Sequence, residues 1–196
     1  MFPIAADSPQ HGRPGFKYGQ MKIISNEITM TTKESIEGLI EQLSNLDGAE
    51  RERARQKLVK IGRPALPFLI DLLSNRTQLL RWEGCKAIGS IADPATAKVL
   101  LKALSDESAE IRWLAAEGLI ALKQQALVPL LQTLETDFES PYVRKGAHHI
   151  LNALERQHLL TNDSKTVLNA LQYLEPKISV ALAARKALQS NLRSGR

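Results

Sequence analysis

Residues 30–196 are predicted to fold as a single all-α solenoid (superhelix) of about five helix pairs. Three observations favour this fold class. Aromatic residues make up only 5% of the 196-residue chain, and Leu and Ala dominate its centre, a composition that suits helices better than sheets. A pattern of arginine, small and aliphatic residues recurs about every 30 residues, as in repeat architectures. Glycine and proline fall between the repeats, where helices should end and begin.

Each predicted unit contains a first helix, A, and a second helix, B. Leucines recur in the A helices, at Leu43, Leu73, Leu104, Leu134 and Leu171. An arginine stands near the start of the first four B helices and an alanine in the fifth, at Arg51, Arg81, Arg112, Arg144 and Ala181. Three residues later comes a small residue, at Ala54, Gly84, Ala115, Ala147 and Ala184. Seven residues after the arginine comes an aliphatic one, at Leu58, Ile88, Leu119, Leu151 and Leu188.

These columns predict how the units stack. A lone helix pair cannot bury its apolar stripe, so neighbouring pairs should pack side by side around one core. The small column should allow close helix approach, and the aliphatic column should fill the space between A and B layers. Each arginine should bond polar groups in the preceding turn, with Asp106 as candidate partner of Arg112 and Asp137 of Arg144. The last arginine interval is 37 residues rather than 30–32, because it holds an insertion around residues 157–164.

Capping residues mark the helix boundaries. Asp93-Pro94 and Ser140-Pro141 each place an N-cap residue before a proline at the first helical position, where the missing N–H costs little. New helices are therefore expected to begin at both prolines.

The N-terminal segment, residues 1–29, is expected to be a flexible tail. Its six proline and glycine residues interrupt any apolar periodicity, and it has no apolar stretch of the kind found in signal peptides. Met30 directly precedes a capping box at residues 31–34, which favours a helix start there. The folded part should begin near this point, and Met30 is an alternative initiator.

Charge and cysteine content narrow the functional classes. Five basic residues after Glu175 account for the net charge of +5, and the rest of the chain holds 21 basic and 21 acidic side chains. A protein that contacts phosphates along its length should be basic along its length, which disfavours nucleic acid as a partner. Cys85 is the only cysteine, and no apolar run could span a bilayer. A cytoplasmic location without a membrane partner is therefore expected.

The segments SDESAEIRWLAAEGLIALK and PATAKVLLKALSDESAEIRWLAAEGL resemble HEAT repeats, an armadillo-type fold. Their sequence is most similar to the short bacterial repeats named after phycobilisome lyases. The resemblance covers about residues 34–190. It implies an α-solenoid whose B helices line the concave side, and it implies no single function, because this repeat class occurs in many unrelated roles.

No catalytic residue, metal site or cofactor is predicted, so the chain is expected not to be an enzyme. Phosphate loops, dinucleotide-binding glycine patterns, H-E-x-x-H and C-x-x-C are missing from the sequence. Deoxyhypusine hydroxylase, a HEAT-fold enzyme, resembles this class and binds iron through His-Glu pairs, but this chain has no His-Glu dipeptide. His148 and His149 should point about 100° apart on a helix and share no metal. Cys85 is expected to be a buried small residue, with a reactive thiol or a pigment contact as its alternative.

The outward face of the B helices carries the candidate binding residues. At about 100° per residue, positions one, five and eight after the arginine point away from the core. Both tryptophans occupy the first of these positions on neighbouring helices, and tryptophan is favoured at binding hot spots. The alternative is that each tryptophan packs over its own helix pair. The candidate partner-binding residues are Trp82, Lys86, Trp113, Glu117, Lys145 and His149.

The sequence favours a non-catalytic interaction module or adaptor that binds a protein partner through the concave face of its B helices. Three alternatives remain. The resemblance implies a bilin lyase subunit or phycobilisome-associated factor, with bilin or phycobiliprotein as partner. Nucleic-acid binding, as in HEAT-like DNA glycosylases, and an unassigned enzymatic activity are the others. The tryptophans suit a protein, a pigment or a base equally well and do not discriminate among these.

Overall fold

The computed structural model describes residues 35–172 and 177–194. The chain divides into two compact units, Met1–Ser35 and Ile36–Arg196, and the described residues fall almost entirely in the second. The predicted tail at residues 1–29, Met30 and the capping box at residues 31–34 lie outside the described residues.

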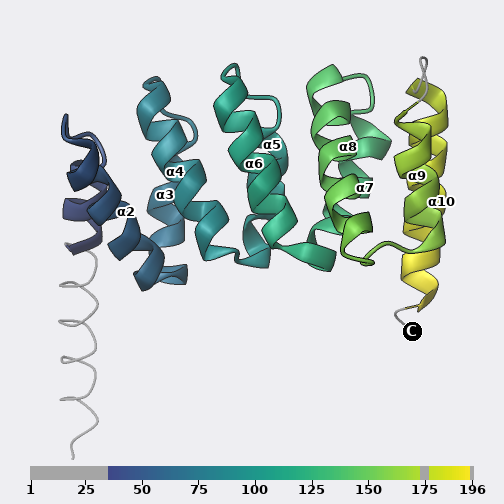
Figure 1. Cartoon of the computed structure of the whole chain (residues 1–196), viewed down its shortest axis with the longest axis horizontal. Helices are drawn as coiled ribbons and strands as arrows, with labels where there is room; N and C mark the ends of the chain where they lie inside the picture. Colours follow the sequence, from purple (N-terminus) through teal and green to yellow (C-terminus); the bar gives the residue numbers. More distant parts are fainter. Residues whose placement is uncertain (1–34, 173–176, 195–196) are drawn as a thin grey trace, which may run out of the picture. The chain divides into compact units, whose positions relative to one another are not determined.

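The second unit is a series of helix pairs, and the described residues contain no strand. The first helices of the pairs are residues 35–42, α3 (Leu66–Leu72), α5 (Ala97–Ala103), α7 (Leu127–Thr136) and α9 (Asn162–Ala170). The second helices are α2 (Gly48–Ile61), α4 (Gln78–Ile91), α6 (Ala109–Ala121), α8 (Pro141–Arg156) and α10 (Lys177–Ser194). Short 3-10 turns lead into three of the first helices, at Arg63–Ala65, Pro94–Thr96 and Lys123–Ala126. The predicted all-α solenoid of five helix pairs is confirmed (Figure 1).

The first four pairs are arranged in two rows. Helices α2, α4, α6 and α8 pack against one another in chain order and form the B row (Figure 1). Helices α3, α5 and α7 form the A row, each against the B helix of its own pair. Because consecutive B helices touch directly, residues at equivalent positions along the B row become spatial neighbours.

The predicted columns form the core between these rows. The four alanines of the small column have no exposed surface, at Ala54, Ala115, Ala147 and Ala184. At Gly84, the fifth member, a Cβ atom would lie 2.9 Å from the Cβ of Leu72 in α3, so only glycine fits without movement. Four of the five aliphatic residues are also fully buried, and Leu188 is partly buried. The sequence therefore correctly predicted which face is buried in the second helix of each pair.

The column arginines tie each B helix to the loop before it. In all four, Nη1 donates to the main-chain carbonyls five and six residues earlier, at 2.6–3.2 Å. This confirms the predicted bond to the preceding turn but corrects its chemistry, since the acceptors are carbonyls rather than carboxylates. Arg112 bonds the carbonyl of Asp106, whose carboxylate pairs instead with Arg81 of the preceding repeat, at 2.9 Å. Arg144 bonds the two carbonyls that follow Asp137 rather than its carboxylate.

The predicted caps are confirmed. The Asp93 carboxylate accepts from the Ala95 N–H at 2.9 Å, and the Ser140 hydroxyl accepts from the Val143 N–H at 3.3 Å. Asp93 also accepts from Nε of Arg63 in the preceding loop, at 2.7 Å. The Ala95 hydrogen bond and the Arg63 guanidinium lower the pKa of Asp93. This carboxylate therefore links two successive inter-repeat loops as well as capping a turn.

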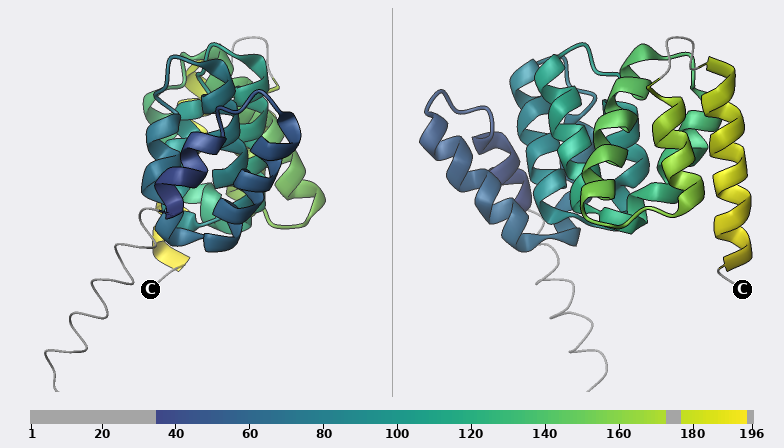
Figure 2. Two further views of the ribbon diagram at one scale, coloured as in Figure 1. Left: turned by 90° about the vertical axis from the view of Figure 1, so that its left-hand side faces the viewer. Right: turned by 45° about the vertical axis from the view of Figure 1, so that its right-hand side comes forward.

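The last pair departs from the prediction. Helix α10 packs along α7 and α9, and α9 packs against α8, so α10 joins the A row and α9 joins the B row (Figures 1 and 2). Ion pairs follow the same exchange: Arg185 of α10 pairs with Glu135 of α7 at 2.7 Å, and Lys165 of α9 pairs with Glu155 of α8 at 3.0 Å. Ala184 is buried as predicted, but α10 does not extend the B row.

Two sequence features account for the exchange. Position 181 holds alanine, so α10 lacks the arginine that ties the other B helices to their preceding loops. The insertion after α8 forms a tight turn, in which His158 has a φ of 58° and the Leu159 N–H donates to the Leu154 carbonyl at 3.0 Å, as in a Schellman motif. The connection from α8 to α9 therefore differs from the shorter connections of the other repeats, and α9 packs against α8.

Candidate binding groove between helices α6 and α8

Four of the six predicted binding residues meet where α6 faces α8. Trp113 and Glu117 are exposed one turn apart on α6, and 56% of the Trp113 surface is accessible. Lys145 and His149 stand on α8 at equivalent exposed or half-exposed positions. The prediction that these side chains share one outward face is therefore correct.

His149 connects the two helices. Its ring lies 4.6 Å from the Trp113 ring, centroid to centroid, with 37° between their planes. Its Nε2 atom lies 2.8 Å from a carboxylate oxygen of Glu117. Trp113 is thus held against α8 by a ring contact while its other face remains open to solvent. The His149 imidazole therefore contacts both Trp113 and Glu117.

Tyr142 completes the site and was not predicted. It lies in the first turn of α8 with 49% of its surface exposed. The Arg112 guanidinium sits over its ring, 4.3 Å from the centroid, at a distance typical of a cation–π contact. Tyr142 lies two positions before Arg144, whereas the predicted binding positions all follow the column arginine. An aromatic residue directly after Pro141, in a turn that should be exposed, was the available signal.

A groove of about 420 Å³ runs along this contact between α6 and α8. Its lining contains aromatic, basic and small apolar residues and no aspartate or glutamate: Leu104, Ala109, Arg112, Trp113, Ala116, Tyr142, Lys145, Gly146, His148, His149 and Asn152. A Cβ atom on Gly146 would lie 2.9 Å from a methyl carbon of Leu104, so the almost fully buried Leu104 side chain packs directly against the Gly146 backbone beneath the groove. We call this feature the α6–α8 groove.

Trp82, the other predicted aromatic residue, has different surroundings. It is half-buried on α4, and the Arg55 guanidinium of α2 lies 5.3 Å from its ring centroid. Glu83, almost fully buried, pairs with both Arg51 and Arg55. The hollow beside Trp82 has a volume of about 540 Å³, and two carboxylates, Glu83 and Glu110, lie in its lining. The full lining is Arg51, Gln78, Leu79, Trp82, Glu83 and Glu110. Lys86 is exposed on the same helix and lines neither hollow.

The spacing of the B helices has a local cause. A Cβ atom on Gly89 of α4 would lie 3.1 Å from the Cα of Gly118 in α6, so the two backbones nearly touch. The equivalent positions in the next step of the B row are Ile120 of α6 and Ile150 of α8. Isoleucine side chains need more room than glycine, so α6 and α8 cannot approach in the same way. The α6–α8 groove lies in this step of the B row.

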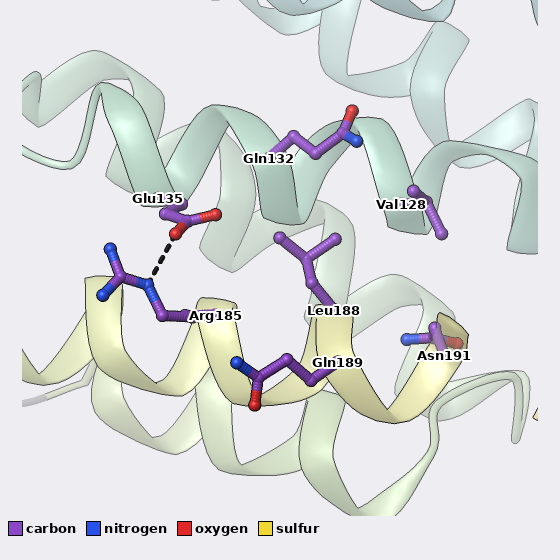
Figure 3. A pocket seen from close by; sticks show the side chains of 7 residues that line it. All are labelled: Val128, Gln132, Glu135, Arg185, Leu188, Gln189 and Asn191. Carbon is purple, nitrogen blue, oxygen red and sulfur yellow. Dashed lines mark hydrogen bonds and ion pairs between the residues drawn. The ribbon is translucent and has the colours of Figure 1, made fainter. Parts of the chain in front are cut away.

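A third hollow, of about 500 Å³, lies between the A helix α7 and the exchanged helix α10. Figure 3 shows Glu135 and Arg185 joined across it, with Leu188 and Val128 further along. Both charged groups that line it are used by this 2.7 Å ion pair. The hollow is therefore a packing feature of the last pair, with no unpaired charge to attract a ligand.

Cys85, the remaining candidate for a reactive side chain, is in an unreactive environment. Cys85 is fully buried, and its Sγ lies 3.9 Å from the Ile111 carbonyl. Burial, with a smaller effect from Asp106, raises the pKa of the Cys85 thiol to about 12, so the reactive-thiol alternative has no support. The described residues contain no group of three or more His, Cys, Asp or Glu side chains that could hold a metal ion. None of their helices is long and apolar enough to cross a membrane.

Comparisons with known proteins identify the repeats. A family model described as HEAT repeats matches residues 36–110 and 97–189. Among solved structures, the chain is similar to an engineered protein at 17% sequence identity and a TM-score of 0.39, over 78% of this chain and 77% of that one. It is also similar to a designed armadillo repeat protein at 17% identity and a TM-score of 0.34, over 78% of this chain and 98% of that one. No curated protein matches the chain at a significant level.

Proposed function

Because the chain belongs to the family of HEAT-repeat proteins, we propose that it is a non-catalytic interaction module, with the α6–α8 groove as the centre of its partner-binding surface. The partner is a protein, and the surface is the outward face of the B row, which in a HEAT solenoid is the concave side. Lys86 and Trp82 form its α4 margin. We further propose that the protein acts in the cytoplasm.

One observation carries the proposal. Trp113 and Tyr142, on facing helices, expose 56% and 49% of their surfaces beside a groove with an apolar floor. Large aromatic side chains that stand exposed around a hollow are costly to hydrate, and they are the residues enriched at binding hot spots. Leu182 of α10 is equally exposed, at 59%, but it borders none of the three hollows described above.

The test is partner capture by the full chain. Wild type, a Trp113→Ala/Tyr142→Ala double variant and a Leu182→Ala control are immobilised, and the proteins retained from native cells are identified by mass spectrometry. A protein retained by wild type and control but lost by the double variant is then purified. Calorimetry should show binding to the double variant weakened by about 30-fold or more, as for a hot spot.

Two controls keep this test decisive. Circular dichroism must show that the double variant keeps its helical content. A Trp82→Ala variant measures how far the surface extends onto α4. Retention of the same proteins by wild type and double variant alike would disprove the role of the groove.

A bilin-handling role is the second candidate. The α6–α8 groove combines ring walls with Lys145 and lacks carboxylates, which suits a tetrapyrrole with propionate groups, and the phycobilisome-lyase resemblance supports it. A shift in the absorption spectrum of a bilin or phycobiliprotein on adding wild type, and not the double variant, would favour it over protein binding. Nucleic-acid binding has less support, because the groove offers too few cations to follow a phosphate backbone.

A further inference from the structure

We propose that the α6–α8 groove takes a short acidic peptide segment of its partner, with one large apolar side chain seated on the groove floor. The inference deepens the proposed function and depends on it. It follows from the charge of the lining, from the unused donors and from the shape of the floor.

Charge is the first argument. The groove lining contains Arg112, Lys145 and two histidines, and no carboxylate. Glu117, which is hydrogen-bonded to His149 at 2.8 Å, lies outside this lining. With two permanent cations and no carboxylate in the lining itself, the groove favours an occupant with negative charge over one with positive charge. The hollow beside Trp82, by contrast, has its own carboxylates in Glu83 and Glu110.

Unused donors are the second argument. Arg112 already serves two carbonyls and the Tyr142 ring. Lys145 is exposed, and it forms no ion pair or hydrogen bond with the part of the chain that the structure describes. A carboxylate placed above it gains a charge-assisted partner without breaking an existing bond. Lys145 is therefore the side chain that selects for an acidic residue.

The floor supplies the apolar requirement. Ala109, Ala116 and Gly146 line the groove beside Trp113 and Tyr142 with small groups, and the almost fully buried Leu104 lies beneath them. A volume of about 420 Å³ accommodates one or two large side chains rather than a folded domain. Both rings remain about half exposed, so the groove suits an extended segment that lies across it. An enclosed small-molecule site would bury more of its walls.

The test uses full-length protein labelled with 5-fluorotryptophan, which gives one ¹⁹F signal for each of the two tryptophans. Trp82→Phe and Trp113→Phe variants assign the signals. The probes are matched pools of peptides of about twelve residues, a length typical of groove-binding segments. One pool carries Asp and Glu around a central Leu or Phe, a second replaces the acids by Lys, and a third replaces the central residue by Ala.

The acidic apolar pool should shift the Trp113 signal saturably and leave the Trp82 signal in place. The basic pool and the alanine pool should each bind at least about tenfold more weakly than the acidic apolar pool. Lys145→Glu should weaken binding of the acidic pool by a similar factor, while Lys98→Glu, the same charge change at an exposed position of the A-row helix α5, should alter it by less than about twofold. Added salt should weaken binding of the acidic pool.

Equal shifts from acidic and basic pools, or equal effects of the two lysine variants, would overturn the inference. So would a Trp113 shift that an oligonucleotide or biliverdin produces and the acidic pool does not. If a captured protein still depends on Trp113 and Tyr142 while the acidic pool shows no preference, only the peptide chemistry is wrong. If neither assay depends on the groove, the proposed function fails as well.

Discussion

Trp82 and Trp113 occupy equivalent positions one repeat apart, yet they differ in how far their rings are covered. Trp82 is half-buried under Arg55, next to the buried Glu83. Trp113 is 56% exposed and contacts His149. The repeat determines where each ring is attached, and the neighbouring helices determine whether it is covered.

The covering residue is identifiable. Arg55 stands four positions after the column arginine of α2, and the equivalent residue beneath Trp113 is Cys85 of α4. Cys85 is too short to reach over the ring and is buried itself. Glu83 forms an ion pair with Arg55, which lies over Trp82, and its equivalent in α6 is Leu114. Two substitutions in the repeat pattern thus turn a covered tryptophan into an exposed one.

The largest expected effect on the free energy of unfolding comes from removing the Glu83 carboxylate. Glu83→Ala leaves Arg51 and Arg55 facing an empty polar site, and it should lower the free energy of unfolding by about 2–3 kcal/mol, less than a fully buried pair because both arginines reach water. Urea unfolding measures it. Glu117→Ala, on the exposed side of the comparison, should cost about 0.5 kcal/mol or less. Equal costs for the two variants would show that Glu83 does not hold the covered region together.

Overpacking the small column ranks second. Ala115 is fully buried in α6, and Ala115→Leu forces extra carbons into a close helix contact, at a typical cost of about 1–3 kcal/mol. Ala121→Leu, at an exposed position of the same helix, should change the free energy of unfolding by about 0.5 kcal/mol or less. If Ala115→Leu unfolds at the same urea concentration as wild type, the buried face of α6 is assigned incorrectly.

The connections before α5 and α7 give a smaller effect that depends on pH. Asp93 caps the first and pairs with Arg63, whereas the equivalent residue of the second is the uncharged Gln124. Because the pKa of Asp93 is lowered in the folded protein, its stabilisation is complete above the unfolded pKa of about 3.9 and is lost as pH falls through the folded value.

Asp93→Asn keeps the capping oxygen and removes the charge. Its Tm should lie a few degrees below that of wild type at pH 7, and the gap should close as the pH falls below about 4. Arg63→Gln removes one of the two interactions and should give an intermediate gap. A difference in Tm that is the same at neutral and acid pH would rule out the ion pair as its cause.

The smallest stability effect is expected at the groove itself. Trp113→Ala should change the free energy of unfolding by about 0.5 kcal/mol or less, as at other exposed sites. Trp82→Ala should cost more, about 1–2 kcal/mol, because its ring packs on the core and under Arg55. Iodide quenching separates the two rings: Trp113 in a Trp82→Phe variant should be quenched more strongly than Trp82 in a Trp113→Phe variant. The reverse order would contradict the comparison.

Sequence periodicity was sufficient for the fold and for the buried face of each helix. The columns through Ala115 and Leu119 predicted residues that are fully buried, because burial in a repeat follows from spacing along one helix. The sequence predicted which turn each column arginine bonds but not which acceptor atom it uses, since Asp106 has both a carboxylate and a carbonyl. Arg112 bonds the carbonyl, and the carboxylate pairs with Arg81 of the preceding repeat.

Contacts between helices were the part that periodicity could not supply. The cover of Arg55 over Trp82 joins residues of different repeats, as does the contact of Gly89 with Gly118. Tyr142 lies outside the repeating positions altogether. The exchange of α9 and α10 depends on an insertion that has no equivalent in the other repeats. Each of these features breaks the pattern, and each affects which part of the B row is open.

The exchanged last pair also limits how such a chain can be lengthened. Helices α5 and α6 present matching A and B surfaces on both sides, so an internal duplication of that unit meets neighbours of its own kind. A duplicated α9–α10 unit would set an A-row helix against a B-row surface, and its charges, fitted as Arg185 is to Glu135, would lose their partners. Growth by gene duplication is therefore open in the middle of this protein and closed at its last pair.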